Sequence, residues 1–125
     1  MTIFRSKKSG NVSHKPTRYF SSKQEKFVAE SINGNTTKNS GATMFNPGDI
    51  ESKHFLIECK TKMKSSQSIS IKKEWLNKIK AESAIANKPY TALIFNFGPD
   101  EENYAIIDLQ LFNLLQELIN NGMMD

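Results

Sequence analysis

The chain has 125 residues, which is enough for one hydrophobic core but not for two. It contains no run of about eighteen apolar residues, which excludes a membrane-spanning helix, and we expect no membrane partner. The charges at its N-terminus are not followed by an apolar stretch, so we expect no secretory signal. Its single cysteine, Cys59, excludes an internal disulfide and fits the reducing cytoplasm.

The net charge of +4 is distributed unevenly along the chain. All 17 Lys and Arg residues lie at or before Lys88, and the six acidic residues after it have no basic residue among them. The first 48 residues carry eight basic residues against two acidic ones, Glu25 and Glu30. A basic first part and an acidic last part of the chain predict that one face of the protein binds a polyanion such as nucleic acid. Charged runs also occur on plain solvated surfaces.

The first part of the chain is poor in apolar residues. Residues 1–20 are basic and aperiodic and predict a flexible arm, followed by a single domain over residues 21–125. A Ser-Ser pair can cap a helix over about 22–32. Residues 33–48 are rich in turn formers, with a short apolar piece at 43–45 that fits an edge strand.

The second part alternates strand and helix patterns. A hairpin is predicted over 49–60, a long helix over about 71–87, strands over 90–97 and 104–107, and a final helix over about 109–121. The expected buried residues of the long helix are Ile71, Trp75, Leu76, Ile79 and Ala86. Those of the final helix are Leu111, Leu114, Leu115 and Leu118. The resulting order, α-β-β-β-α-β-β-α, predicts an α/β fold with a mixed central sheet flanked by helices.

The hairpin carries the residues that indicate a function. A four-residue connection places Asp49 opposite Glu58, at a Cβ separation of about 5 Å. Strand alternation puts Glu58 and Lys60 on one face, and Cys59 on the opposite, apolar face that packs inward. Two carboxylates can hold Mg²⁺, and an adjacent ammonium can orient the attacking water, so the pattern is typical of a metal-dependent nuclease. Asp49 also fits an ordinary turn aspartate, and Glu58 with Lys60 the polar side of an amphipathic strand.

Other reactive residues fit this site less well. His54 precedes Glu58 by about 13 Å of strand, which is too far to share a metal, and it is predicted to lie in the loop. Cys59 is more consistent with core packing than with nucleophilic chemistry. The sequence has no His pair or Cys cluster for zinc and no glycine-rich phosphate loop, so we expect no nucleotide cofactor.

These residues resemble the PD-(D/E)xK nuclease superfamily, and within it the small Holliday junction resolvases of archaea and phages. The resemblance is carried by Glu25, Ser40-Gly41, Gly48-Asp49-Ile50 and Glu58-Cys59-Lys60, and it covers about residues 22–97. Pro47 stands one residue earlier than the literal motif requires. The resemblance implies a restriction-endonuclease-like αβββαβ core, an obligate homodimer, and Mg²⁺-dependent hydrolysis of branched DNA, with Mn²⁺ as a substitute metal.

The resemblance also assigns roles to single residues. Asp49 and Glu58 correspond to the metal-binding carboxylates, Lys60 to the catalytic lysine, and Ser40 to a loop serine at the scissile phosphate. Glu25 corresponds to the helix glutamate that completes the metal site, with Glu30 as the alternative. The residues expected to contact DNA are Lys7, Lys8, Lys15, Arg18, Lys62, Lys64, Lys73 and Lys80.

The sequence leaves three hypotheses about function open. One is a junction resolvase, the second is a restriction, nicking or repair nuclease on the same fold, and the third is a non-catalytic nucleic-acid-binding protein. A two-fold dimer follows from the two symmetric cuts that a resolvase makes, with its surface either on an apolar strand edge or on the last helix.

Overall fold

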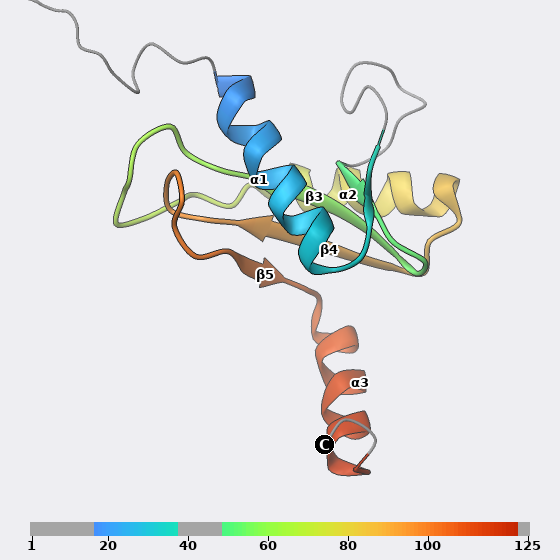
Figure 1. Cartoon of the computed structure of the whole chain (residues 1–125). Helices are drawn as coiled ribbons and strands as arrows, with labels where there is room; N and C mark the ends of the chain where they lie inside the picture. The colour runs from blue at the N-terminus through green and yellow to red at the C-terminus, as the bar shows by residue number, and fades with distance from the viewer. Residues whose placement is uncertain (1–16, 38–48, 123–125) are drawn as a thin grey trace, which may run out of the picture.

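The structure is a computed structural model and describes residues 17–37 and 49–122. Its elements, in chain order, are α1 (Thr17–Ser31), β1 (Asn35–Thr36), β2 (Ile50–Glu51), β3 (Phe55–Lys60), α2 (Lys73–Ala86), β4 (Tyr90–Phe95), β5 (Tyr104–Ile106) and α3 (Leu109–Asn120). The strands form one mixed sheet in the order β1-β2-β3-β4-β5 (Figure 1). The predicted α/β class, a mixed sheet flanked by helices, is therefore confirmed.

The sheet contains one parallel pair of strands, and its other pairs are antiparallel. β1, β2 and β3 are antiparallel neighbours, β3 and β4 run parallel, and β5 returns antiparallel to β4. Parallel neighbours need a long crossover, which α2 supplies between β3 and β4. β4 has a strand on each side, as its apolar sequence predicted, but it ends at Phe95, two residues earlier than predicted.

The two sides of β3 face different helices. Ile57 and Cys59 are buried in a cluster with Val28 of α1, which confirms the prediction that this apolar face packs inward. On the other side, the Lys60 ammonium lies over the Trp75 ring of α2. Because side chains alternate along a strand, α1 and α2 cover opposite faces of the sheet (Figure 1).

Several element boundaries differ from those predicted. α1 begins at Thr17 rather than near residue 22, because Phe20 is buried and extends the inward-facing stripe of the helix by one turn. Residues 17–20, predicted as arm, are thus helical, and residues 1–16 lie outside the described residues. The short strand β1 was not predicted, and the predicted strand at 43–45 also lies outside the described residues. Ile71 precedes α2 and is exposed rather than buried.

The last helix differs most from its prediction. Of its four leucines expected in the core, only Leu111 is buried, whereas Leu114 is exposed and Leu115 and Leu118 are half-buried. The reason is geometric: α3 follows β5 and extends away from the sheet instead of returning across it (Figure 1). No helix within the described residues is long and apolar enough to cross a membrane.

Candidate active site

Asp49 is fixed at the entrance to β2 by bonds to both neighbouring strands. Its N–H donates to the Ile57 carbonyl oxygen at 2.9 Å, and its own carbonyl oxygen accepts from the Thr37 N–H at 2.9 Å. Its side-chain Oδ2 accepts from the Cys59 N–H at 2.8 Å. The hairpin has the predicted register, with Glu51 paired to Leu56, so its continuation brings Asp49 beside Glu58.

Glu58 lies in the middle of β3 in surroundings that disfavour its charge. Its side chain is only 14% exposed. Burial raises the pKa of the Glu58 carboxyl, and the nearby negative charge of Asp49 raises it further, while Lys60 and Lys78 act in the opposite direction. A carboxylate in this position gains from any cation that binds between it and Asp49.

Lys60 is held from two directions at the end of β3. Its Nζ lies 3.4 Å from Glu58 Oε2 and 4.5 Å from the centre of the Trp75 ring. A cation over the face of an indole is attracted by the ring quadrupole, which fixes the side chain without neutralising it. The Lys60 carbonyl oxygen accepts from Gln24 Nε2 at 2.8 Å and from the Asn96 N–H at 3.3 Å. Lys60 therefore has a defined backbone and a partly exposed ammonium group.

Of the two candidate helix acids, only Glu25 faces the sheet. Glu25 is 5% exposed, and its charge is among those that raise the pKa of the Cys59 thiol. Glu30 is exposed on α1. Burial is the main reason for the raised pKa of Cys59, which keeps the thiol protonated and agrees with a core role. His54 is exposed in the hairpin turn, as predicted.

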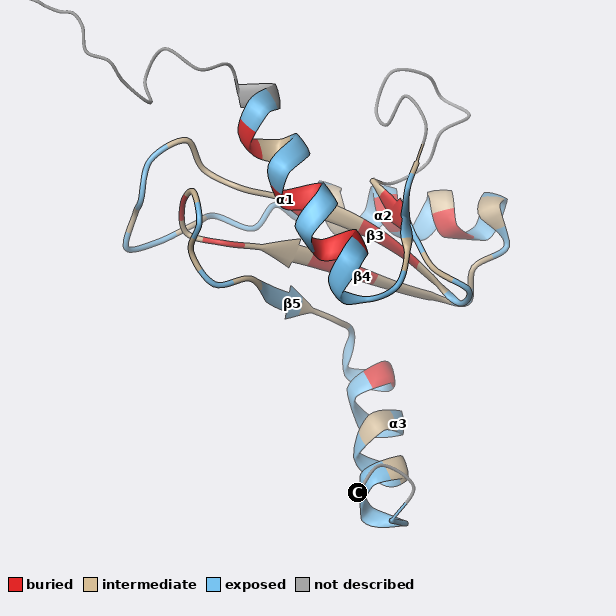
Figure 2. Ribbon diagram, in the orientation of Figure 1, coloured by how far each residue is buried: buried red, intermediate tan, exposed pale blue. Residues whose placement is uncertain are grey.

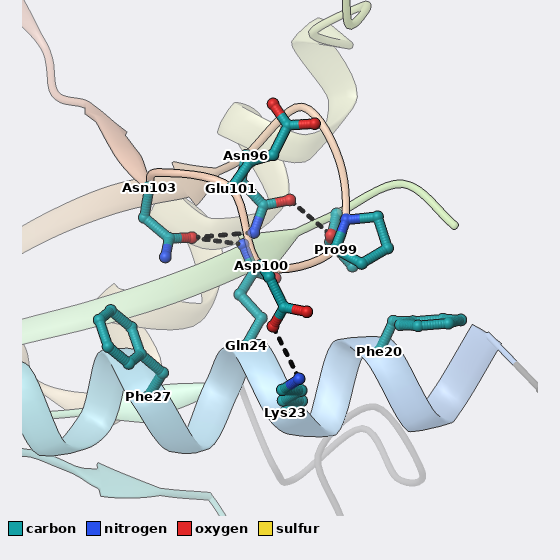
Figure 3. A pocket seen from close by; sticks show the side chains of 10 residues that line it. Phe20, Lys23, Gln24, Phe27, Asn96, Pro99, Asp100, Glu101 and Asn103 are labelled. Atoms are coloured by element: carbon teal, nitrogen blue, oxygen red, sulfur yellow. Dashed lines mark hydrogen bonds and ion pairs between the residues drawn. The ribbon is translucent and has the colours of Figure 1, made fainter. Parts of the chain in front are cut away.

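A network of amide side chains, which the sequence analysis did not identify, borders the site next to Lys60. Asn103 Oδ1 accepts from Gln24 Nε2 at 3.1 Å and from Asn96 Nδ2 at 3.2 Å, and Asn96 Oδ1 accepts from Thr61 Oγ1 at 2.5 Å. These residues line a cavity of about 180 Å³ between α1 and the loop after β4 (Figure 3). The signal for Gln24 was its spacing, four residues from each of Phe20 and Val28 on the buried stripe of α1.

The predicted DNA-contacting residues fall into three groups. Lys7, Lys8, Lys15 and Ser40 lie outside the described residues, and only the helical backbone is described at Arg18. Lys64 and Lys73 are exposed. Lys62 Nζ donates to Ser66 Oγ at 3.1 Å and to the Ser68 carbonyl oxygen at 2.8 Å, and Lys80 Nζ lies 3.5 Å from Asp108 Oδ2.

The donor chemistry of the site fits a hard divalent cation. Asp49 and Glu58 offer carboxylate oxygens, the ligand type that Mg²⁺ and Mn²⁺ prefer in proteins. Across residues 17–37 and 49–122, no group of three or more His, Cys, Asp or Glu side chains is gathered closely enough to form a complete metal cage. Mg²⁺ usually keeps several water molecules and takes one or two carboxylates, so a pair of this kind suits it.

Comparisons of the chain with protein-family models, with curated protein sequences and with solved structures found no match. What the site can do is therefore inferred from its own residues.

Proposed function

We propose that the protein is a Mg²⁺-dependent DNA endonuclease that hydrolyses phosphodiester bonds, and that its substrate is branched DNA of the Holliday junction type. The observation that carries this proposal is the grouping of Asp49, Glu58 and Lys60 on one hairpin. Asp49 lies near enough to raise the pKa of Glu58, and the Lys60 ammonium is 3.4 Å from the Glu58 carboxylate. Two carboxylates that can hold a metal, beside a lysine that can donate to a phosphate oxygen, suit metal-assisted phosphodiester hydrolysis.

The order of the elements supports the same proposal. A helix, three antiparallel strands, a crossover helix and a strand parallel to the third follow one another from α1 to β4. This order is compatible with the αβββαβ core that the resemblance implies. In addition, Asp49 directly precedes the second strand, Glu58 lies in the third, and Lys60 follows Glu58 by two residues.

Each residue has a distinct task in the proposed reaction. Asp49 and Glu58 would hold the metal directly, and Glu25 from α1 would reach it only through a water molecule, because the three carboxylates form no close group among the described residues. When bound, the metal lowers the pKa of a water molecule and offsets negative charge on the phosphate. Lys60 supplies an ammonium group that donates a hydrogen bond to the attacking water or to a phosphate oxygen. The Trp75 ring and the Glu58 carboxylate keep that ammonium directed along the same side of β3.

The choice of substrate rests on the resemblance to small resolvases and on the basic half of the chain. Flanking duplex would be held by lysines that contact phosphate, which give affinity without reading bases. Two symmetric cuts across a junction require two copies of the site, so we propose that the active species is a homodimer.

A nicking assay tests the proposed class and its substrate. We expect the full chain to nick a four-way junction in Mg²⁺ or Mn²⁺, to stop in excess chelator, and to cut linear duplex and single strand more slowly. Equal cutting of linear duplex would favour another nuclease on the same fold. Binding without cutting in any metal would instead identify a non-catalytic DNA-binding protein.

A further inference from the structure

The last helix stands apart from the body of the protein. α3 extends away from the sheet, and most of its surface is exposed (Figures 1 and 2). Among the described elements, α1 and α2 both pack on strands, whereas α3 has no comparable packing with any of them. Within residues 17–37 and 49–122, its first two turns approach the body, where Leu111 and Leu114 line a hollow with Pro89 and Tyr90. The part of the domain that the structure describes therefore covers little of its apolar side chains.

These apolar side chains form one continuous face. At 3.6 residues per turn, all of them except Leu109 at the start of the helix fall within one half of the helix surface. The members of this α3 face are Leu111, Phe112, Leu114, Leu115, Leu118 and Ile119. Phe112 and Ile119 are 48% and 53% exposed. The opposite side carries Gln110, Asn113, Gln116, Glu117 and Asn120. A helix patterned in this way is built to bury one side against a partner.

The charge of the helix excludes two kinds of partner. α3 has one charged residue, Glu117, and the chain has no Lys or Arg after Lys88. Nucleic acid binds through Lys and Arg that neutralise phosphates, which this helix lacks. Amphipathic helices that lie on membranes carry Lys or Arg on their polar side, and these are absent here as well. The remaining kind of partner for the apolar side of α3 is the apolar surface of a protein.

We propose that the α3 face binds the α3 face of a second copy of this chain around a two-fold axis. A two-fold interface uses the same patch on both copies, so the patch must complement itself. The α3 face does so because all its members are apolar and none carries a charge that would repel its own copy. The pairing also leaves the site around Asp49 on each body free, because none of its side chains comes from α3.

Sedimentation equilibrium of the full chain tests this proposal by mass. We expect the wild type to sediment as a dimer of twice 14.2 kDa at micromolar concentrations. Phe112→Glu combined with Ile119→Glu should give a monomer, because it places two charges on the α3 face. The matched control is Asn113→Glu with Asn120→Glu, which adds the same charges at the same spacing on the polar side and should remain a dimer. A monomeric wild type, or a dimer in both double variants, would overturn the proposal.

Cross-linking gives a second readout that does not depend on a disruptive variant. Leu115 lies near the middle of α3, close to the expected axis, so Leu115→Cys should form an intermolecular disulfide with mild oxidant. Asn113→Cys, on the polar side, should not, and the buried Cys59 should stay reduced. Failure of Leu115→Cys to cross-link in a dimeric sample would place the interface elsewhere. These readouts do not involve DNA cleavage, so they can fail while the proposed nuclease activity holds.

Discussion

At the scale of single residues, Glu58 is the group whose setting is most informative. Its carboxylate is largely buried, it lies near the like charge of Asp49, and Lys60 and Lys78 only partly offset these effects. Its pKa is therefore raised in the folded protein. Local arrangements that oppose a charge are common where a cation is to be bound or a proton moved.

The raised pKa predicts that removing the charge stabilises the metal-free protein. Between the ordinary pKa of a glutamate and the raised pKa of Glu58, the folded state holds more protons than the unfolded state. The free energy of unfolding thus falls as pH rises through that window and stays lower above it. At pH 8 in chelator, Glu58→Gln should raise the free energy of unfolding by about 1 kcal/mol. Well below the ordinary pKa of a glutamate, the same substitution should change the free energy of unfolding little.

Urea denaturation at the two pH values measures this difference. Glu51→Gln is the control, because Glu51 is an exposed carboxylate two residues from Asp49 and should change stability little. Mg²⁺ should then stabilise the wild type but not Glu58→Gln, since a ligand that binds only the folded state raises its stability. A less stable Glu58→Gln at pH 8 would contradict the account of this residue.

The sequence could predict much at this scale, because strand alternation and hairpin register are local properties. They gave the pairing of β2 with β3, the inward side of Cys59 and the proximity of Asp49 to Glu58. The contact of Lys60 with Trp75 was out of reach, since it depends on how α2 lies across the sheet. The same holds for the effect of Lys78 on Glu58.

At the scale of elements, Gln24 joins α1 to the end of β3. Its Nε2 donates to the Lys60 carbonyl oxygen and to Asn103 Oδ1, while its Oε1 is buried and accepts no hydrogen bond from the described residues. A buried donor shared by two acceptors is sensitive to its identity, because replacing it leaves oxygens facing oxygens. This link holds Lys60 in place relative to Glu25, the next residue on α1.

Gln24→Glu is therefore predicted to destabilise the protein, although the side chain keeps its shape. We expect a loss of roughly 1–3 kcal/mol in the free energy of unfolding at pH 8, and a smaller loss near pH 4, where a protonated carboxyl can donate again. Gln116→Glu makes the same chemical change on the exposed side of α3 and should have almost no effect. Equal unfolding midpoints for the two variants in urea would show that the network contributes nothing.

The elements themselves were predictable where their pattern was long and regular. The hairpin, α2, β4, β5 and α3 were expected near their observed bounds. The exposure of the α3 leucines was not expected, because periodicity shows that a helix has an apolar side but not which surface covers it. The start of α1 was set by the burial of Phe20, a tertiary contact.

At the scale of the whole molecule, the charges divide along the chain into a basic first part and an acidic last part. α3 and the loop after β4 carry acids only, whereas the lysines after β3 and on α2 lie in the basic part. Some of these lysines already have partners: Lys62 is bound to Ser66 and Ser68, and Lys80 is paired with Asp108. Exposed lysines without such contacts can turn to a phosphate at lower cost.

This difference predicts an order among lysine variants. Lys64→Ala and Lys73→Ala should each weaken DNA binding several-fold and lower the slope of log affinity against log salt by about 1. Lys62→Ala and Lys80→Ala should have smaller effects. Fluorescence anisotropy with a labelled junction in Ca²⁺, over a range of salt concentrations, measures both quantities. If the Lys62 and Lys80 variants weakened DNA binding more than the Lys64 and Lys73 variants, the proposed order of these lysines in DNA binding would be wrong.

The most direct test of the proposed site compares two carboxylates that are two residues apart in the chain, Asp49 and Glu51. Asp49 points its carboxylate at β3, whereas Glu51 is exposed and its Oε1 lies 3.5 Å from Lys88 Nζ. The measurement is the single-turnover rate of junction nicking in Mg²⁺ by the wild type, Asp49→Asn and Glu51→Gln. We predict a loss on the order of 100-fold or more for Asp49→Asn and a nearly unchanged rate for Glu51→Gln. Nicking by Asp49→Asn at the wild-type rate would contradict the assignment of this hairpin as the active site.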